Sequence, residues 1–202
     1  MTEANLERLV AKWQAWAADA DHSEDGWQSD FPEWSRLIES AAEVMQRADS
    51  DPALLRLVEF CWSISEEGEE LLEIARRTIS SCWPVVVAMS ESPLPACRWQ
   101  AYEAATAAGV KAEPLVRAGL SDPAPYARRR AVLALARLAP SDAATVASSL
   151  LHDPDPYIRQ AAIELVSVSD DAAFKKSAFE TLSRDDVDHV RAAAVRQLSC
   201  GR

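Results

Sequence analysis

The second half of the chain repeats itself every 30 to 32 residues, and this period constrains the fold more than any other feature of the sequence. Four segments align without gaps, and an arginine stands at the same place in each: Arg98, Arg128, Arg159 and Arg191. Alanine follows each arginine after three residues, and apolar residues follow after four and seven. These spacings put the apolar positions on one face of a helix, so the repeat predicts four stacked copies of one helical unit.

The residues before each arginine predict where its helix begins. Asp122 and Asp153 are each followed by proline, and Pro125 and Pro156 come two residues later. Aspartate side chains accept hydrogen bonds from free backbone N–H groups, and proline is well tolerated in a first helical turn. A shorter apolar helix is expected before each turn, at residues 83–89, 113–120, 143–151 and 174–183. Each unit is therefore a helix, a tight turn and a second helix.

This pattern of an acidic turn, an arginine that opens the second helix, and then alanine and aliphatic residues resembles the HEAT repeat. It is most similar to the short variety found in phycobilisome-lyase-like proteins, and the resemblance covers residues 82–200. It implies an all-α fold, a right-handed α-solenoid of antiparallel helix pairs. It also implies a ladder in which an aspartate of one repeat pairs with an arginine of its neighbour. The residues of this ladder would be Arg98, Asp122, Arg128, Asp153, Arg159, Asp185 and Arg191.

The first 81 residues lack the regular period and are expected to form divergent helices that cap the stack, because a terminal repeat has one face in water. Apolar spacing predicts helices at 5–18, 32–48 and 71–80, and a weaker copy of the repeat at 49–62. A polar loop is expected at 20–30. No segment has the composition of a linker, so the sequence predicts one continuous domain over residues 1–202, with four repeats over 82–200.

The charge of the chain is unevenly distributed. The formal net charge is −11, and residues 1–97 contain 19 acids and 7 bases, whereas residues 98–202 contain 13 acids and 14 bases. An acidic protein repels phosphate backbones, so a nucleic acid is not the expected partner. The first half should attract a basic protein surface instead.

The cysteines and the N-terminal segment indicate a cytoplasmic protein. Cys61, Cys82, Cys97 and Cys200 show no C-x-x-C spacing, and such cysteines are typical of buried thiols in a reducing compartment. The N-terminal segment is amphipathic and mixed in charge, so no secretory leader is expected. The longest apolar run, 82–89, is far shorter than the roughly 20 residues that span a bilayer.

No motif of an enzyme is present in the sequence. It contains no phosphate-binding loop, no nucleophile elbow and no dinucleotide fingerprint. His152 stands at a repeat turn, and His189 takes the position of Tyr126 and Tyr157, which favours packing roles over a metal site. The sequence therefore predicts a non-enzymatic protein without metal or cofactor.

Two groups of residues are candidates for binding a partner. The second helices line the inner face of a solenoid, and positions one, five and nine after the repeat arginine form a row that can face the groove. Its polar and aromatic members are Trp99, Glu103, Arg129, Arg137, Gln160, Glu164 and Arg196. Trp27 and Phe31 flank an acidic loop and could dock a basic protein. A solvated face is the alternative for the row, and core packing is the alternative for the tryptophans.

These features favour a protein-binding solenoid with a basic partner, either an adaptor or a neutraliser of the immunity-protein type. The resemblance to phycobilisome-lyase-like proteins implies an alternative, a bilin lyase or an accessory protein of an enzyme. Some HEAT-like solenoids are DNA alkylation-repair glycosylases, and Arg128, Arg129, Arg130 and Arg137 form a local basic cluster. The near-neutral balance of the second half argues against that third alternative.

Overall fold

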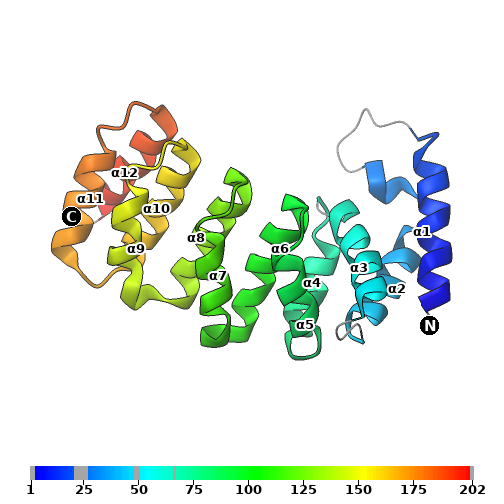
Figure 1. Cartoon of the computed structure of the whole chain (residues 1–202). Helices are drawn as coiled ribbons and strands as arrows, with labels where there is room; N and C mark the ends of the chain where they lie inside the picture. Colours follow the sequence, from blue (N-terminus) through cyan, green and yellow to red (C-terminus); the bar gives the residue numbers. More distant parts are fainter. Residues whose placement is uncertain (1–2, 21–26, 48–50, 66, 201–202) are drawn as a thin grey trace. The chain divides into compact units, whose positions relative to one another are not determined.

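The computed structural model describes residues 3–20, 27–47, 51–65 and 67–200, and the regular elements in these ranges are all helices, with no β-strand among them (Figure 1). The all-α class predicted from the sequence is thereby confirmed. The helices form two compact units, unit 1 (Met1–Ala108) and unit 2 (Gly109–Arg202). The division falls between the first and second predicted repeats, and the single continuous domain stays a prediction.

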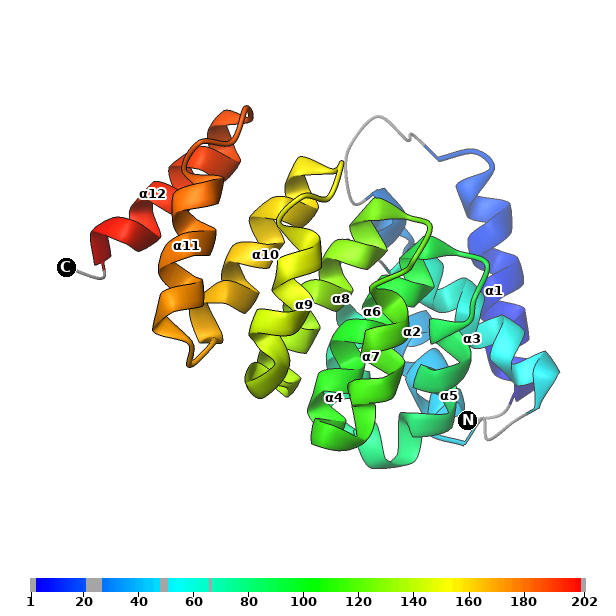
Figure 2. The same ribbon diagram turned by 60° about the vertical axis from the view of Figure 1, so that its left-hand side comes forward.

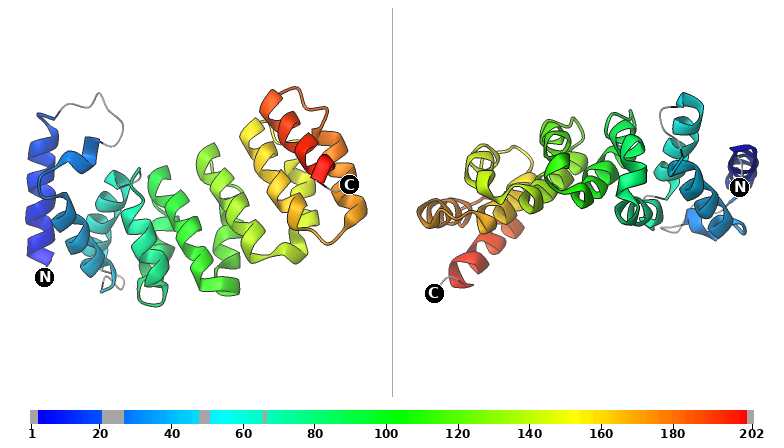
Figure 3. Two further views of the ribbon diagram at one scale, coloured as in Figure 1. Left: turned by 180° about the vertical axis from the view of Figure 1, so that it is seen from behind. Right: turned by 90° about the horizontal axis from the view of Figure 1, so that it is seen from below.

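Unit 1 is built from six α-helices and a short 3-10 helix within the described ranges. They are α1 (Glu3–Ala17), η1 (Trp27–Asp30), α2 (Trp34–Met45), α3 (Pro52–Ile64), α4 (Glu70–Arg77), α5 (Ile79–Ser90) and α6 (Pro95–Ala105). In this unit α1 packs on α2 and α3, and α6 packs on α3, α4 and α5 (Figure 3). Leu6, Leu37, Trp62 and Leu72 are fully buried and belong to the core of the unit.

The divergent helices of unit 1 lie close to the predicted segments, with one difference. The segments predicted at 5–18, 32–48 and 49–62 correspond to α1, α2 and α3. The segment predicted at 71–80 is divided between α4 and α5, because Thr78 ends α4 by donating its hydroxyl to the Ile74 carbonyl at 2.8 Å. Asp49 and residues 21–26 of the predicted loop lie outside the described residues.

Over its described residues, 109–200, unit 2 consists of three helix pairs in sequence order (Figure 2). They are α7 (Glu113–Gly119) with α8 (Pro125–Leu138), α9 (Ala143–Leu150) with α10 (Pro156–Val168), and α11 (Ala172–Leu182) with α12 (Asp188–Cys200). Short 3-10 segments, η2 (Thr106–Ala112) and η3 (Pro140–Asp142), precede the first two pairs. The second helices form a layer in which α10 packs between α8 and α12. The apolar positions at three, four and seven after the arginines lie in the core of α8 and α10, where Ala131, Val132, Leu135, Ala162, Ile163 and Val166 are buried.

Each repeat arginine holds its own turn. Its NH1 group donates to the main-chain carbonyl six residues earlier, from Arg98 to Ser92 at 2.9 Å, Arg128 to Asp122 at 2.8 Å, Arg159 to Asp153 at 3.0 Å and Arg191 to Asp185 at 2.6 Å. The side chain of the same turn residue accepts a hydrogen bond from the backbone N–H two residues further on. The recurring spacing therefore fixes locally where each second helix begins.

None of the helices in the described ranges has the length and apolar character that a membrane span requires.

Replacing Gly109 tests the backbone at the division between the units. Gly109 has φ 63° and ψ −146°, a conformation that residues with a Cβ rarely adopt. A Cβ added there would meet no heavy atom within 4 Å, so the cost of a substitution is conformational rather than steric. We expect Gly109→Ala to lower the free energy of unfolding by about 1–3 kcal/mol in urea titrations. Gly109→Asn should cost as much, because this ψ lies outside the left-handed helical region that asparagine tolerates. A smaller loss for asparagine would contradict the assigned conformation.

Candidate functional site

The two aromatic residues predicted to flank a docking loop lie in an aromatic cluster of unit 1. The Trp27 ring stacks on Trp16 with the ring centroids 5.9 Å apart, and it also lies 5.8 Å from the Trp13 ring. Phe31 is buried, with its ring centroid 5.6 Å from that of Trp16. These rings stabilise the packing of η1 on α1, and Phe31 is not accessible to a partner.

Trp99 and Glu103 are also buried, although the sequence placed them in the groove row. Trp99 is 2% exposed and Glu103 is 1% exposed, both on α6. The Glu103 carboxylate accepts a hydrogen bond from Arg76 of α4 at 2.8 Å. The packing of α4 on α6 thus turns this part of the predicted row into an interior ion pair, which leaves no surface for a partner.

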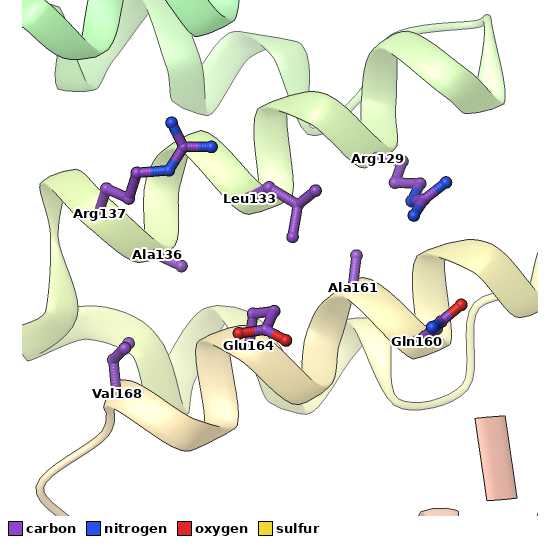
Figure 4. A pocket seen from close by; sticks show the side chains of 8 residues that line it. All are labelled: Arg129, Leu133, Ala136, Arg137, Gln160, Ala161, Glu164 and Val168. Carbon is purple, nitrogen blue, oxygen red and sulfur yellow. The ribbon is translucent and has the colours of Figure 1, made fainter. Parts of the chain in front are cut away.

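The remaining predicted residues come together in unit 2, where a groove runs between α8 and α10 (Figure 4). Arg129 and Arg137 of α8 and Gln160 and Glu164 of α10 line it. The groove has a volume of about 400 Å³. We call it the α8–α10 groove, and its full lining is Arg129, Leu133, Ala136, Arg137, Gln160, Ala161, Glu164 and Val168. Arg196, the last member of the predicted row, is exposed on α12 and does not line the groove.

A stack of three side chains from successive second helices holds Arg129 at one end of the groove. The guanidinium carbon of Arg129 lies 5.6 Å from the ring centroid of Tyr157, a distance at which cation–π attraction operates. On α12, His189 stacks on Tyr157 with centroids 4.8 Å apart and planes inclined by 22°. Arg129, Tyr157 and His189 therefore join α8, α10 and α12 at the end of the layer where these helices begin.

Sequence reasoning missed the tyrosines at this end of the layer. Tyr126 is 48% exposed and Tyr157 is 53% exposed, and both line a second hollow of about 430 Å³ next to the groove. Arg129 lines both hollows, so the surface continues from one to the other. The signal that could have found them is an aromatic residue four positions after each turn aspartate, at Tyr126, Tyr157 and His189.

The ladder residues of unit 2 lie beside the partners that the resemblance implied. Arg159 Nε and NH2 lie 2.7 and 2.8 Å from the two carboxylate oxygens of Asp185, a bidentate pair. Arg128 Nε lies 3.8 Å from the Asp153 carboxylate, a looser contact. The hydrogen bonds from Arg159 lower the pKa of Asp185 to about 2, although burial opposes the shift, and the same pair raises the pKa of Arg159. This geometry fixes the register between successive repeats.

The Asp185–Arg159 pair predicts a pH dependence of stability. The folded pKa of Asp185 is about 2, below the value of about 3.9 for a free aspartate, so the pair stabilises the fold above about pH 4. That contribution falls away as the pH drops from about 4 to about 2. We expect Asp185→Asn to cost about 1–2 kcal/mol at pH 7, after allowance for solvent screening, and close to nothing at pH 2. Urea titrations at both pH values measure this difference.

Asp186→Asn is the matched control for this prediction. The Asp186 side chain is 90% exposed, and it also contacts Arg159, at 3.1 Å. Its loss should cost well under about 1 kcal/mol at any pH. A penalty for Asp185→Asn that does not change with pH would contradict the charge-based account.

No group of three or more His, Cys, Asp or Glu side chains is placed to hold a metal ion in the described part of the chain. Cys61, Cys82 and Cys97 are buried, and none of them is in a disulfide bond in the described part of the chain. Burial raises the pKa of the Cys61 thiol to about 12, which suppresses its reactivity.

The successive helix pairs of unit 2, with a groove between neighbouring second helices, define an α-helical repeat module. Residues 112–199 match the family described as HEAT repeats. Residues 112–199 therefore carry HEAT repeats, and the resemblance to HEAT repeats is confirmed over this range. The likeness to the phycobilisome-lyase-like variety stays a prediction. The first predicted copy, in unit 1, lies outside the matched range. Comparison with the sequences of curated proteins gives no match. HEAT repeats point to a protein-interaction scaffold.

Proposed function

We propose that this protein is a non-enzymatic scaffold that binds a protein partner through the α8–α10 groove. One observation carries the proposal: Arg129, Arg137, Gln160 and Glu164 stand at repeat positions one, five and nine and converge on one hollow. Arginine side chains above an apolar floor are typical anchors of protein interfaces. The exposed tyrosines beside the groove extend the same kind of surface.

The charge of unit 1 favours a partner that is basic overall. Residues 1–108 contain 20 acids and 8 bases, and residues 109–202 contain 12 acids and 13 bases. Such an acidic unit speeds the approach of a basic protein and raises specificity for it. The protein would then serve as an adaptor, or as a neutraliser of the immunity-protein type. The buried thiols fit a cytoplasmic location.

A capture experiment with the tagged full chain tests this function. The groove variant carries Arg129→Ala and Arg137→Ala, and the control variant carries Lys176→Ala and Arg184→Ala, which removes two exposed bases of the third helix pair. We expect a basic protein retained by the wild type and the control, with at least about tenfold weaker retention by the groove variant. Circular dichroism checks that all three proteins are folded.

The result that would overturn the proposal is a partner held equally by the groove variant and the control. A partner released only when acids of unit 1 are neutralised would move the contact surface to unit 1. Steep loss of retention with salt is expected for a basic partner, because exposed charges are screened over about 8 Å at physiological ionic strength.

A further inference from the structure

Two charged side chains of the α8–α10 groove have no ion pair among the described residues. Arg129 and Glu164 line the same groove, on opposite helices, and no carboxylate or base in the described ranges lies within ion-pairing distance of either. On the same two helices, Arg128 and Arg159 pair with aspartates of the next repeat. Arg129 and Glu164 are therefore two charges that the groove offers to another molecule.

Arg129 is held in place before any partner arrives. Its guanidinium lies over the Tyr157 ring, and His189 stacks on the same ring with the centroids 4.8 Å apart. Its Nε atom is buried without a hydrogen-bond partner in the described part of the chain. An arginine fixed in this way loses little side-chain entropy on binding a carboxylate, and its planar group suits carboxylate geometry.

The floor of the α8–α10 groove is apolar. Leu133, Ala136, Ala161 and Val168 line it. Figure 4 shows Leu133 and Ala161 between the Arg129 and Glu164 side chains, and Ala136 and Val168 beyond Glu164, on the side of Arg137. Alanine at two of these positions leaves room for larger apolar side chains from outside. An apolar strip bounded by charges on two packed helices matches the helix-in-groove mode of recognition.

We propose that the occupant of the groove is an amphipathic helix of the partner, with an apolar stripe on the floor, a carboxylate on Arg129 and a basic side chain on Glu164. This inference rests on the proposed function and specifies what the partner presents. A partner that is basic overall satisfies it with one acidic residue beside the stripe. Residues at spacings of three and four share a helix face, so one helix supplies the stripe and both charges.

Designed peptides test the occupant without knowledge of the natural partner. Three peptides of about 16 residues are used, a length sufficient for a helix to form. They share one leucine stripe and differ at two positions that flank it. These carry Glu and Lys, Glu and Glu, or Lys and Lys. Each is titrated into ¹⁵N-labelled full-length protein, and the Arg129 Nε–H and the Glu164 amide resonances report binding in the groove.

Reciprocal charge changes on the protein give the expected pattern. The wild type should bind the Glu and Lys peptide about tenfold more tightly than the other two. Glu164→Lys should shift the preference to the Glu and Glu peptide, and Arg129→Glu should shift it to the Lys and Lys peptide. Lys176→Glu, outside the groove, should leave the order unchanged.

Equal binding of the three peptides, or no shift of the groove resonances up to about millimolar concentrations, would overturn the assignment of this occupant. If either result is found while the groove variant still retains the captured partner more weakly than the wild type, the proposed function stands and only the occupant is wrong. If the groove variant retains the partner as strongly as the wild type does, the proposed function itself is overturned.

Discussion

Trp62→Ala is expected to lower the free energy of unfolding by about 3–5 kcal/mol, the cost typical of truncating a large buried aromatic side chain. Trp62 lies on α3 and is 0% exposed, and α3 packs against α1, α2 and α6. The Gln100 side chain of α6 also donates to the Trp62 carbonyl at 3.0 Å, so the two helices are joined at this point. Urea or thermal unfolding followed by circular dichroism measures the loss.

Trp62→Phe separates the packing of this side chain from its polar atom. The indole Nε1 of Trp62 is buried without a hydrogen-bond partner among the described residues, a situation that itself costs free energy. Phenylalanine keeps most of the apolar volume and removes the unsatisfied donor, so we expect a loss below about 1.5 kcal/mol. Equal losses for the phenylalanine and alanine variants would show that volume is not the dominant contribution at this position.

The helix pairs of unit 2 could be predicted closely, because local chemistry fixes them. The segments predicted at 113–120, 143–151 and 174–183 correspond to α7, α9 and α11 within two residues at each end. The turns that follow α7 and α9, and so the starts of α8 and α10, are set by aspartate and arginine side chains that bond to the backbone of the same turn. Boundaries set by such short-range bonds can be read from a single sequence. The division of the chain at Gly109 could not be predicted from the sequence, because it depends on how the helices cluster in space.

The candidate site could be predicted only where the repeat is regular. Position five after the repeat arginine is Glu103 in α6, Leu133 in α8 and Glu164 in α10. Leu133 and Glu164 line the groove, but Glu103 is interior, because α4 of the divergent segment supplies Arg76 beside it. The sequence pattern of α6 is the same whether or not α4 packs there. The burial of Glu103 follows from tertiary contacts that periodicity does not encode.

The stack of Arg129, Tyr157 and His189 shows a second limit of sequence reasoning. The three residues are recognisable as neighbours only when α8, α10 and α12 are seen side by side in one layer. Within the sequence, His189 stands where two earlier repeats have tyrosine, and this substitution predicts a packing role. The structure supports that reading, and it adds what the packing does: the ring of Tyr157 fixes the arginine that faces the groove.

Arg76→Ala is expected to destabilise the fold by about 2–4 kcal/mol, because it removes a positive charge beside a carboxylate that is out of contact with water. Arg76 NH2 lies 2.8 Å from Glu103 Oε2, and Glu103 is 1% exposed. In this variant the buried Glu103 carboxylate loses a charged hydrogen-bond donor, and weakening the pairing of a buried charge costs free energy. The measurement is the free energy of unfolding in urea at pH 7. Arg77→Ala is the control, because that side chain is 69% exposed and its ion pair with Glu73 is loose, at 4.0 Å.

A double-mutant cycle measures how much of this loss comes from the interaction between Arg76 and Glu103. The cycle consists of Arg76→Met, Glu103→Leu and the double variant, which keeps the volume and removes both charges. The double variant should therefore be less destabilised than the sum of the two single losses. If the two single losses add up to the loss of the double variant, the destabilisation comes from the lost packing of the arginine side chain instead. The outcome also bears on function, because an interior ion pair that can be replaced by apolar residues has a purely structural role. The accessible charges of the chain that can select a partner would then lie elsewhere, among them Arg129 and Glu164 in the α8–α10 groove.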